Sequence, residues 1–184
     1  MKRLGAFLII GLLAVIVALL AGIYVGTQSS DTIQQSSPTP DAAVIARFFA
    51  SSLDDVDGKP FPFAQWQGKT LVVNFWATWC PPCREEMPAF SRLQSLYSAK
   101  GVQFVGIALD SAESVRSFSE RYPVNYPLLI GGSRGVDLAQ QFGNSNLGLP
   151  YTVILGPGRE VRLLQLGPLS ESELDRFLQE SALR

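Results

Sequence analysis

The chain has 184 residues, enough for one domain of ordinary size and an additional segment. Its net charge is −1 and only 17 % of its residues are charged, so no basic surface typical of nucleic-acid binding is present and no nucleic-acid partner is expected. The absence of histidine excludes histidine-based metal sites, Ser-His-Asp and Cys-His catalysis, and proton transfer through imidazole.

The N-terminal segment is apolar. Lys2 and Arg3 precede a run without charged residues that includes residues 4–26. About 20 apolar residues cross a bilayer, whereas a cleaved signal peptide has an apolar stretch of only ~7–15 residues before a small-residue cleavage site. We therefore expect residues 1–27 to form a single uncleaved transmembrane anchor in the cytoplasmic membrane. Its basic end should face the cytoplasm, which places the remaining chain outside and makes membrane lipid one of its partners.

The segment after this anchor is polar. Residues 28–41 are rich in Ser, Gln, Thr and Pro, a composition typical of a flexible tether. Residues 42–184 are then predicted to form the soluble domain.

Short apolar runs in the soluble domain predict strands. These runs are residues 70–77, 104–110, 127–130, 151–156 and 160–167. The first three are continuous and suit strands buried on both faces. The turn Pro157-Gly158-Arg159 separates the last two, which predicts an antiparallel hairpin.

Helical patterns lie between these runs. Apolar residues recur at helical spacing in 90–97 and in 136–142, where Gly143 is a predicted helix end. Asp110 with Glu113, and Ser170 with Glu173, resemble capping boxes that open two further helices. Strands that alternate with helices predict an α/β fold with a mostly parallel central sheet, closed by the hairpin.

The only two cysteines, Cys80 and Cys83, are separated by two residues. A zinc site needs four ligands, usually Cys or His, and a disulfide across so short a loop removes little chain entropy. Cys80 follows a predicted buried strand and precedes a helix, whose N-terminus favours the thiolate. We therefore predict a redox pair in which Cys80 attacks a substrate disulfide and Cys83 resolves the mixed intermediate, with no metal and no other cofactor.

The segment "VVNFWATWCPPCREEMP" (residues 72–88) resembles the active-site segment of the thioredoxin fold. More narrowly, it is similar to the TlpA/ResA-like family of membrane-anchored thiol-disulfide oxidoreductases. The resemblance covers about residues 49–178 and includes W-C-P-P-C, then Pro88 in the helix, then "GLPYT" at 148–152. It implies a thioredoxin-like fold with a central mixed sheet flanked by helices. It also implies a helix–strand insertion at 111–132.

The resemblance also implies a substrate surface. It implies a cis Leu149–Pro150 bond in a loop that faces the cysteines and offers its backbone to an extended substrate. Tyr151 departs from the family, which often has a small hydroxyl residue there. The predicted substrate-binding residues are Trp79, Pro81, Pro82, Leu149 and Pro150.

Two polar residues flank the motif. Asn74 aligns with a buried aspartate that thioredoxin uses as a proton acceptor, but asparagine cannot ionise. Glu86 matches a glutamate that the family carries just after the CxxC motif, which makes it a candidate third catalytic residue beside Cys80 and Cys83. The alternative for Glu86 is a solvated helix carboxylate favoured by the helix dipole.

The expected function is therefore extracytoplasmic reduction of protein disulfides. By resemblance, the leading substrates are the haem-binding cysteines of apocytochrome c during cytochrome c maturation, and a membrane-embedded thiol carrier would supply electrons. The alternatives are a thiol-disulfide oxidant, a general extracytoplasmic thioredoxin, or a non-catalytic binding module. A peroxidase and a copper chaperone are disfavoured, because they need a Thr-x-x-Cys setting and a histidine, respectively.

Overall fold

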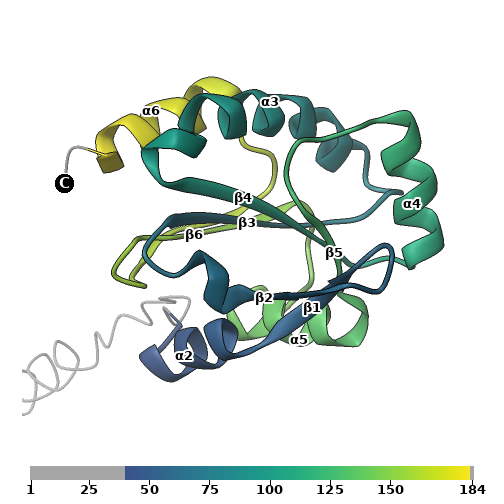
Figure 1. The fold of residues 1–184 in the computed structure, drawn as a ribbon, viewed down its shortest axis with the longest axis horizontal. Helices are drawn as coiled ribbons and strands as arrows, with labels where there is room; N and C mark the ends of the chain where they lie inside the picture. Colours follow the sequence, from purple (N-terminus) through teal and green to yellow (C-terminus); the bar gives the residue numbers. More distant parts are fainter. Residues whose placement is uncertain (1–39, 183–184) are drawn as a thin grey trace, which may run out of the picture. The chain divides into compact units, whose positions relative to one another are not determined.

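The computed structural model describes residues 40–182, so the predicted anchor and nearly all of the predicted tether lie outside the described residues. Within this range, no helix has the length and apolar character needed to cross a membrane. The described chain forms one seven-stranded sheet with helices on both faces (Figure 1). The thioredoxin-like α/β architecture is confirmed.

The sheet has the strand order β2-β1-β5-β4-β3-β6-β7. Its strands are β1 (Ser52–Asp55), β2 (Pro60–Pro62), β3 (Thr70–Trp76), β4 (Val102–Ala108), β5 (Leu128–Ile130), β6 (Tyr151–Leu155) and β7 (Val161–Leu166). Two of the six pairings, β3 with β4 and β4 with β5, are parallel. The mixed sheet is confirmed, and so is the β6–β7 hairpin. The prediction of mostly parallel pairing is wrong, because β6 joins β3 in antiparallel orientation and β1 and β2 add further antiparallel pairings at the other edge.

Helices cover the two faces of the sheet. Their bounds are α2 (Ala42–Ala50), α3 (Pro81–Tyr97), α4 (Ala112–Arg121), α5 (Gly132–Gln141) and α6 (Glu171–Ala182), and short 3₁₀ turns occupy Phe63–Trp66 (η1) and Ser98–Lys100 (η2). Helices α3 and α6 lie over one face, and α2 and α5 over the other (Figure 1). Side chains of α4 join the core on the α3 side.

The central strand β3 supplies both halves of the core. Val72 and Trp76 pack in the cluster on the α3 side, while Leu71, Val73 and Phe75 pack in the cluster on the α2 and α5 side. Successive side chains of a strand point to opposite faces, so a strand covered on both sides needs an uninterrupted apolar run. This explains why all but two of residues 70–76, Thr70 and Asn74, are apolar.

The predicted capping boxes have different outcomes. At α6, the Ser170 backbone N–H donates to Glu173 Oε2 at 3.0 Å and the Glu173 N–H donates to Ser170 Oγ at 3.3 Å, which confirms the box. At α4, the prediction for Asp110 is wrong. Ser111 is the N-cap and accepts from the Ser114 N–H at 3.1 Å, and Asp110 instead accepts hydrogen bonds from Thr78.

Candidate active site

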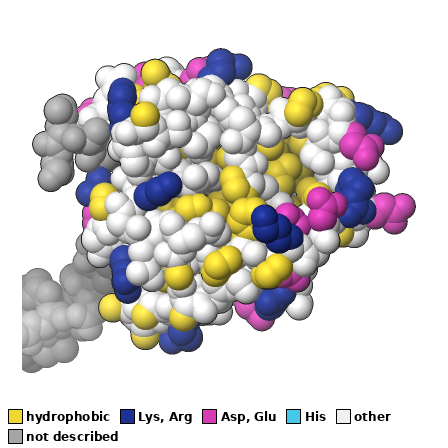
Figure 2. Space-filling model, viewed as in Figure 1, with side chains coloured by type: hydrophobic (Ala, Val, Ile, Leu, Met, Phe, Trp, Pro, Cys, Tyr) yellow, Lys and Arg dark blue, Asp and Glu magenta, His cyan; other side chains and the backbone are white. Residues whose placement is uncertain are grey.

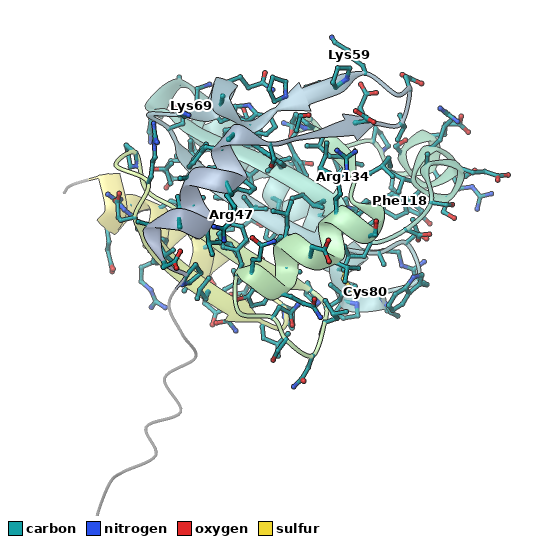
Figure 3. All side chains as sticks on the ribbon, turned by 90° about the horizontal axis from the view of Figure 1, so that it is seen from below. Arg47, Lys59, Lys69, Cys80, Phe118 and Arg134 are labelled. Atoms are coloured by element: carbon teal, nitrogen blue, oxygen red, sulfur yellow. A yellow bond between two sulfur atoms is a disulfide. The ribbon has the colours of Figure 1, made fainter. Side chains whose placement is uncertain are left out.

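The two cysteines form a disulfide at the junction of β3 and α3. Cys80 is the N-cap of α3 and Cys83 lies in its first turn. Cys83 is fully buried and Cys80 is only 4 % exposed. Figure 3 shows Cys80 at the edge of the described domain, beyond the end of the sheet. The junction of a buried strand and a helix therefore presents the disulfide at the surface while keeping both sulfur atoms largely covered.

The N-terminus of α3 offers the Cys80 sulfur one backbone donor. Pro81 and Pro82 occupy the first two helical positions and have no N–H. The Cys83 N–H donates to Cys80 Sγ at 3.3 Å, and the Arg84 N–H donates instead to the Cys80 carbonyl. A helix N-terminus normally presents several free N–H groups. Here a Cys80 thiolate would receive one of them.

The Leu149–Pro150 bond is cis, as the resemblance implied. Strand β6 pairs with β3 so that Tyr151 lies opposite Phe75, and Pro150 therefore lies beside the end of β3 from which the disulfide loop leaves. Leu149 packs against the core cluster that contains Cys80 and Cys83. The structure thus places the predicted proline loop beside the end of β3 that leads into the cysteine pair.

Tyr151, the departure from the family pattern, has a structural contact. Its hydroxyl donates to the Phe142 carbonyl oxygen at 2.7 Å, and its ring lies 6.1 Å from that of Phe75. The tyrosine therefore ties the start of β6 to the end of α5 on the sheet face opposite α3. Tyr151 therefore supports the proline loop from the sheet face opposite α3.

Glu86 is buried, with 4 % of its surface exposed. Its Oε1 accepts from the Asn74 amide at 2.8 Å, and its Oε2 accepts from the Leu169 backbone N–H at 3.1 Å. Burial raises the pKa of Glu86 from 4.5 to about 7, although both hydrogen bonds act in the opposite direction. The solvated-carboxylate alternative does not hold for this side chain.

Glu86 lies close to Cys83. Cys83 and Glu86 are three residues apart on α3, and both are buried, so they lie on the same inward face of adjacent turns. A carboxyl group with a pKa near 7 can accept and return a proton at neutral pH. The side chain of Asn74, which cannot ionise, holds this carboxylate by a hydrogen bond.

Sequence reasoning missed two contributors to the site. Thr152 is fully buried, and its Oγ accepts from the Asn74 amide at 3.1 Å, which links β6 to Glu86. Asp110 accepts hydrogen bonds from the Thr78 hydroxyl and from the Thr78 N–H at 3.2 Å, so it fixes the loop before Cys80 to the end of β4. Neither contact could be predicted from a local pattern, because Thr152 and Asp110 lie 78 and 32 positions from the residues that they contact.

The remaining predicted residues lie at the surface around the disulfide. Trp79 is 68 % exposed, so it lies open to solvent beside Cys80 and is not a core residue. Pro81 is also exposed and Pro82 is partly buried. Leu166 is 56 % exposed, and its side chain packs over Gly148 next to the proline loop. The rim of the disulfide is therefore largely apolar.

Comparison with known proteins agrees with this geometry. The family model described as Redoxin matches residues 34–178. The chain belongs to the redoxin family. Thioredoxin-like protein YneN from Bacillus subtilis is 31 % identical over 150 residues, which cover 79 % of each chain. Thiol-disulfide oxidoreductase ResA from Halalkalibacterium halodurans is 28 % identical over 128 residues, covering 69 % of this chain and 70 % of the relative.

Solved structures give the same result. A thioredoxin-family thiol:disulfide interchange protein from Chlorobium tepidum has a TM-score of 0.63 and 32 % identity, over 72 % of this chain and 92 % of that chain. Together with the Cys80–Cys83 disulfide, these relatives place this redoxin in the TlpA/ResA-like group. It is a thiol-disulfide oxidoreductase.

Proposed function

We propose that this redoxin reduces protein disulfides outside the cytoplasm, held at the membrane by its N-terminal segment. The observation that supports reduction is the N-terminus of α3, which gives the Cys80 sulfur a single backbone donor. Hydrogen-bond donors that stabilise the thiolate stabilise the dithiol form and make the pair more oxidising. A site with few donors therefore favours a pair that gives electrons away.

The reaction has two exchange steps. The Cys80 thiolate attacks one sulfur of a substrate disulfide, forms a mixed disulfide and releases the other substrate sulfur as a thiolate. Cys83 loses its proton to Glu86, and its thiolate attacks Cys80 Sγ. This forms the Cys80–Cys83 disulfide and releases the second substrate thiolate. Two electrons pass to the substrate, and a membrane-embedded thiol carrier would return the pair to the dithiol state.

Apocytochrome c is the proposed substrate class. The haem-binding cysteines of such a protein must be reduced before haem attachment, and a tethered reductant outside the cytoplasm could do this. The single backbone donor at Cys80 favours a reductant over an oxidant. The exposed Trp79 and the apolar rim favour a protein substrate over a small thiol.

The reduction potential of the Cys80–Cys83 pair tests the direction of electron flow. We expect a value below about −180 mV, towards thioredoxin's value of about −270 mV, after equilibration with glutathione buffers. Pro82→Ala restores one N–H at the helix start and should raise the potential by roughly 30–60 mV, the equivalent of one hydrogen bond to a charged group. A wild-type potential above about −180 mV would contradict the proposal.

Membrane anchoring is tested by fractionation. The apolar run at 4–26 after Lys2 and Arg3 predicts that the full-length chain stays with the membrane after alkaline carbonate extraction. A membrane-impermeant thiol reagent should label reduced Cys80 in intact cells. Recovery of the full-length chain in the soluble fraction, or labelling only after lysis, would contradict the anchor or its orientation.

A further inference from the structure

An open groove lies between α3 and α4, next to the disulfide. Its volume is about 610 Å³, and its lining includes Pro81, Met87 and Pro88 from α3 and Phe118 and Tyr122 from the α4 side. Pro81 is also part of the CxxC motif, so the groove begins at the redox centre. In Figure 2, which has the view of Figure 1, apolar side chains gather between the α3 edge and the α4 edge.

The α4 wall of this groove is an aromatic series that leads from the core to the surface. The ring of Trp76, which is fully buried, lies 5.0 Å from that of Phe118, and the Phe118 ring lies 5.1 Å from that of Tyr122. Tyr122 is 58 % exposed. An exposed aromatic ring held by packing behind it loses little conformational entropy when it binds an apolar side chain.

Two arginines lie where this groove meets a second hollow. The second hollow has a volume of about 420 Å³ and shares Arg84, Phe118, Arg121 and Tyr122 with the groove. Acidic residues are distributed differently, because Glu85 lines only the groove and Glu113 only the second hollow. The centre of the combined surface is therefore basic.

These two guanidinium groups are not held by a carboxylate in the described part of the chain. Among residues 40–182, the side chains of Arg84 and Arg121 have no ion pair, while four other arginines do. Both side chains are exposed. Arginine beside an aromatic ring and an apolar groove is the composition of energetically important contacts in protein interfaces.

We propose that the α3–α4 groove binds a segment of the disulfide-bearing partner protein in which a large apolar side chain lies next to a carboxylate. This rests on the proposed function, since it specifies the substrate that the same redox centre would reduce. The apolar side chain would contact Tyr122 and Pro88, and the carboxylate would pair with Arg121 and Arg84. The groove would thereby favour substrates that carry these residues near the reacting cysteine. This contact would add to the contacts that the substrate makes with the proline loop.

Two synthetic peptides test this selection. Both carry the same intramolecular disulfide with a tryptophan on each side, and they differ in having Asp or Lys next to each tryptophan. The second-order rate constant for oxidation of the reduced full-length protein is measured for each. At low salt, wild type should react with the Asp peptide about 5–10-fold faster than with the Lys peptide, and salt should reduce this preference.

Variants test whether the groove causes the preference for the Asp peptide. Arg121→Glu should abolish or invert the preference for the Asp peptide, while Tyr122→Ala should slow both peptides alike. The matched control is Arg47→Glu, which makes the same charge change on exposed α2. Figure 3 shows Arg47 away from both Cys80 and Phe118. The Arg47→Glu variant should keep the wild-type ratio of the rate constants for the Asp and Lys peptides.

Each outcome separates the two proposals. If Arg121→Glu and Arg47→Glu show the same ratio of rate constants for the two peptides, the groove does not select peptides by their charge. The inference is then overturned. If wild type reduces both peptides equally at low salt, the inference also fails while the reductase proposal stands. If reduced wild type reacts with neither peptide, the proposed reduction fails and the inference fails with it.

Discussion

Cys80→Ser is expected to reduce the rate of disulfide exchange to that of the uncatalysed reaction. A serine hydroxyl is essentially un-ionised at neutral pH and cannot form a disulfide, so no mixed intermediate arises. Cys83→Ser should differ in kind. It leaves the attacking sulfur at the helix start, where the residue 83 N–H still reaches it, but removes the group that resolves the mixed disulfide. This variant should accumulate covalent complexes with substrate.

Insulin reduction with a dithiol donor measures the first effect, and non-reducing gels of cells that express each variant measure the second. The double variant Cys80→Ser/Cys83→Ser is the control for thiol-independent binding. Its fold should persist, because a disulfide over so short a loop contributes little to stability. Trapped complexes with Cys80→Ser but none with Cys83→Ser would show that the two roles are reversed.

The stability of the protein should fall between about pH 4.5 and pH 7 because of Glu86. The native carboxyl has a pKa of about 7 and the unfolded one about 4.5, so in this range the folded state holds the extra proton. Raising the pH removes that proton and leaves a buried charge, which destabilises the folded state. Integrated over the shift, the loss is about 3 kcal/mol, complete above pH 7.

Glu86→Gln should remove this slope. Urea unfolding of oxidised wild type and variant from pH 4.5 to pH 8 measures it. A glutamine that accepts from Asn74 turns its own NH₂ towards the Leu169 N–H, so the variant loses that hydrogen bond at a cost of about 1–3 kcal/mol. The free energy of unfolding at a single pH is therefore less informative than its change with pH. Glu85→Gln, an exposed neighbour on α3, is the matched control. An equal slope in both variants would mean that Glu86 ionises normally.

The same ionisation should appear in the chemistry. If Glu86 accepts the Cys83 proton, its loss should slow resolution of the mixed disulfide at neutral pH. A carboxylate near a thiolate also raises the thiol pKa, so Glu86→Gln should shift the cysteine titration downward. Stopped-flow measurements of the two exchange steps, with thiol absorbance against pH, separate these effects. Unchanged values for both would leave Glu86 with a purely structural role.

Some of the fold was readable from sequence because local pattern and burial agree. Residues 70–76 are apolar except for Thr70 and Asn74, as suits a strand covered on both faces, and the turn at 157–159 marks the hairpin. Strands β1 and β2 were missed because they consist of "SLDD" and "PFP", residues with low strand propensity. They exist because β1 pairs with β5, with Asp54 opposite Ile130. Strand β5 itself lies within the insertion at 111–132, far along the chain from β1.

The site likewise has features that a local pattern predicts and features that depend on contacts between distant residues. The cysteine pair is recognisable from spacing, since its chemistry depends on neighbours in one helical turn. The hydrogen bonds of Asn74 to Glu86 and to Thr152 join residues 12 and 78 positions apart, so no local pattern signals them. Asp110 looked like a helix cap because aspartate is common there, but Ser111 took that position and left the carboxylate to hold Thr78.

The environment of the Glu86 carboxylate has a mechanical consequence. Both of its oxygens face donors, the Asn74 amide and the Leu169 N–H, so the ionised form suits the site's contacts and the neutral form weakens one of them. Leu169 lies in the segment that leads from β7 into α6. Proton uptake by Glu86 would therefore weaken either the hydrogen bond from α3 to Asn74 of β3 or the one from α3 to the segment before α6. If Glu86 takes the Cys83 proton as proposed, thiol exchange at one end of α3 would also change how firmly this helix is held to the rest of the domain.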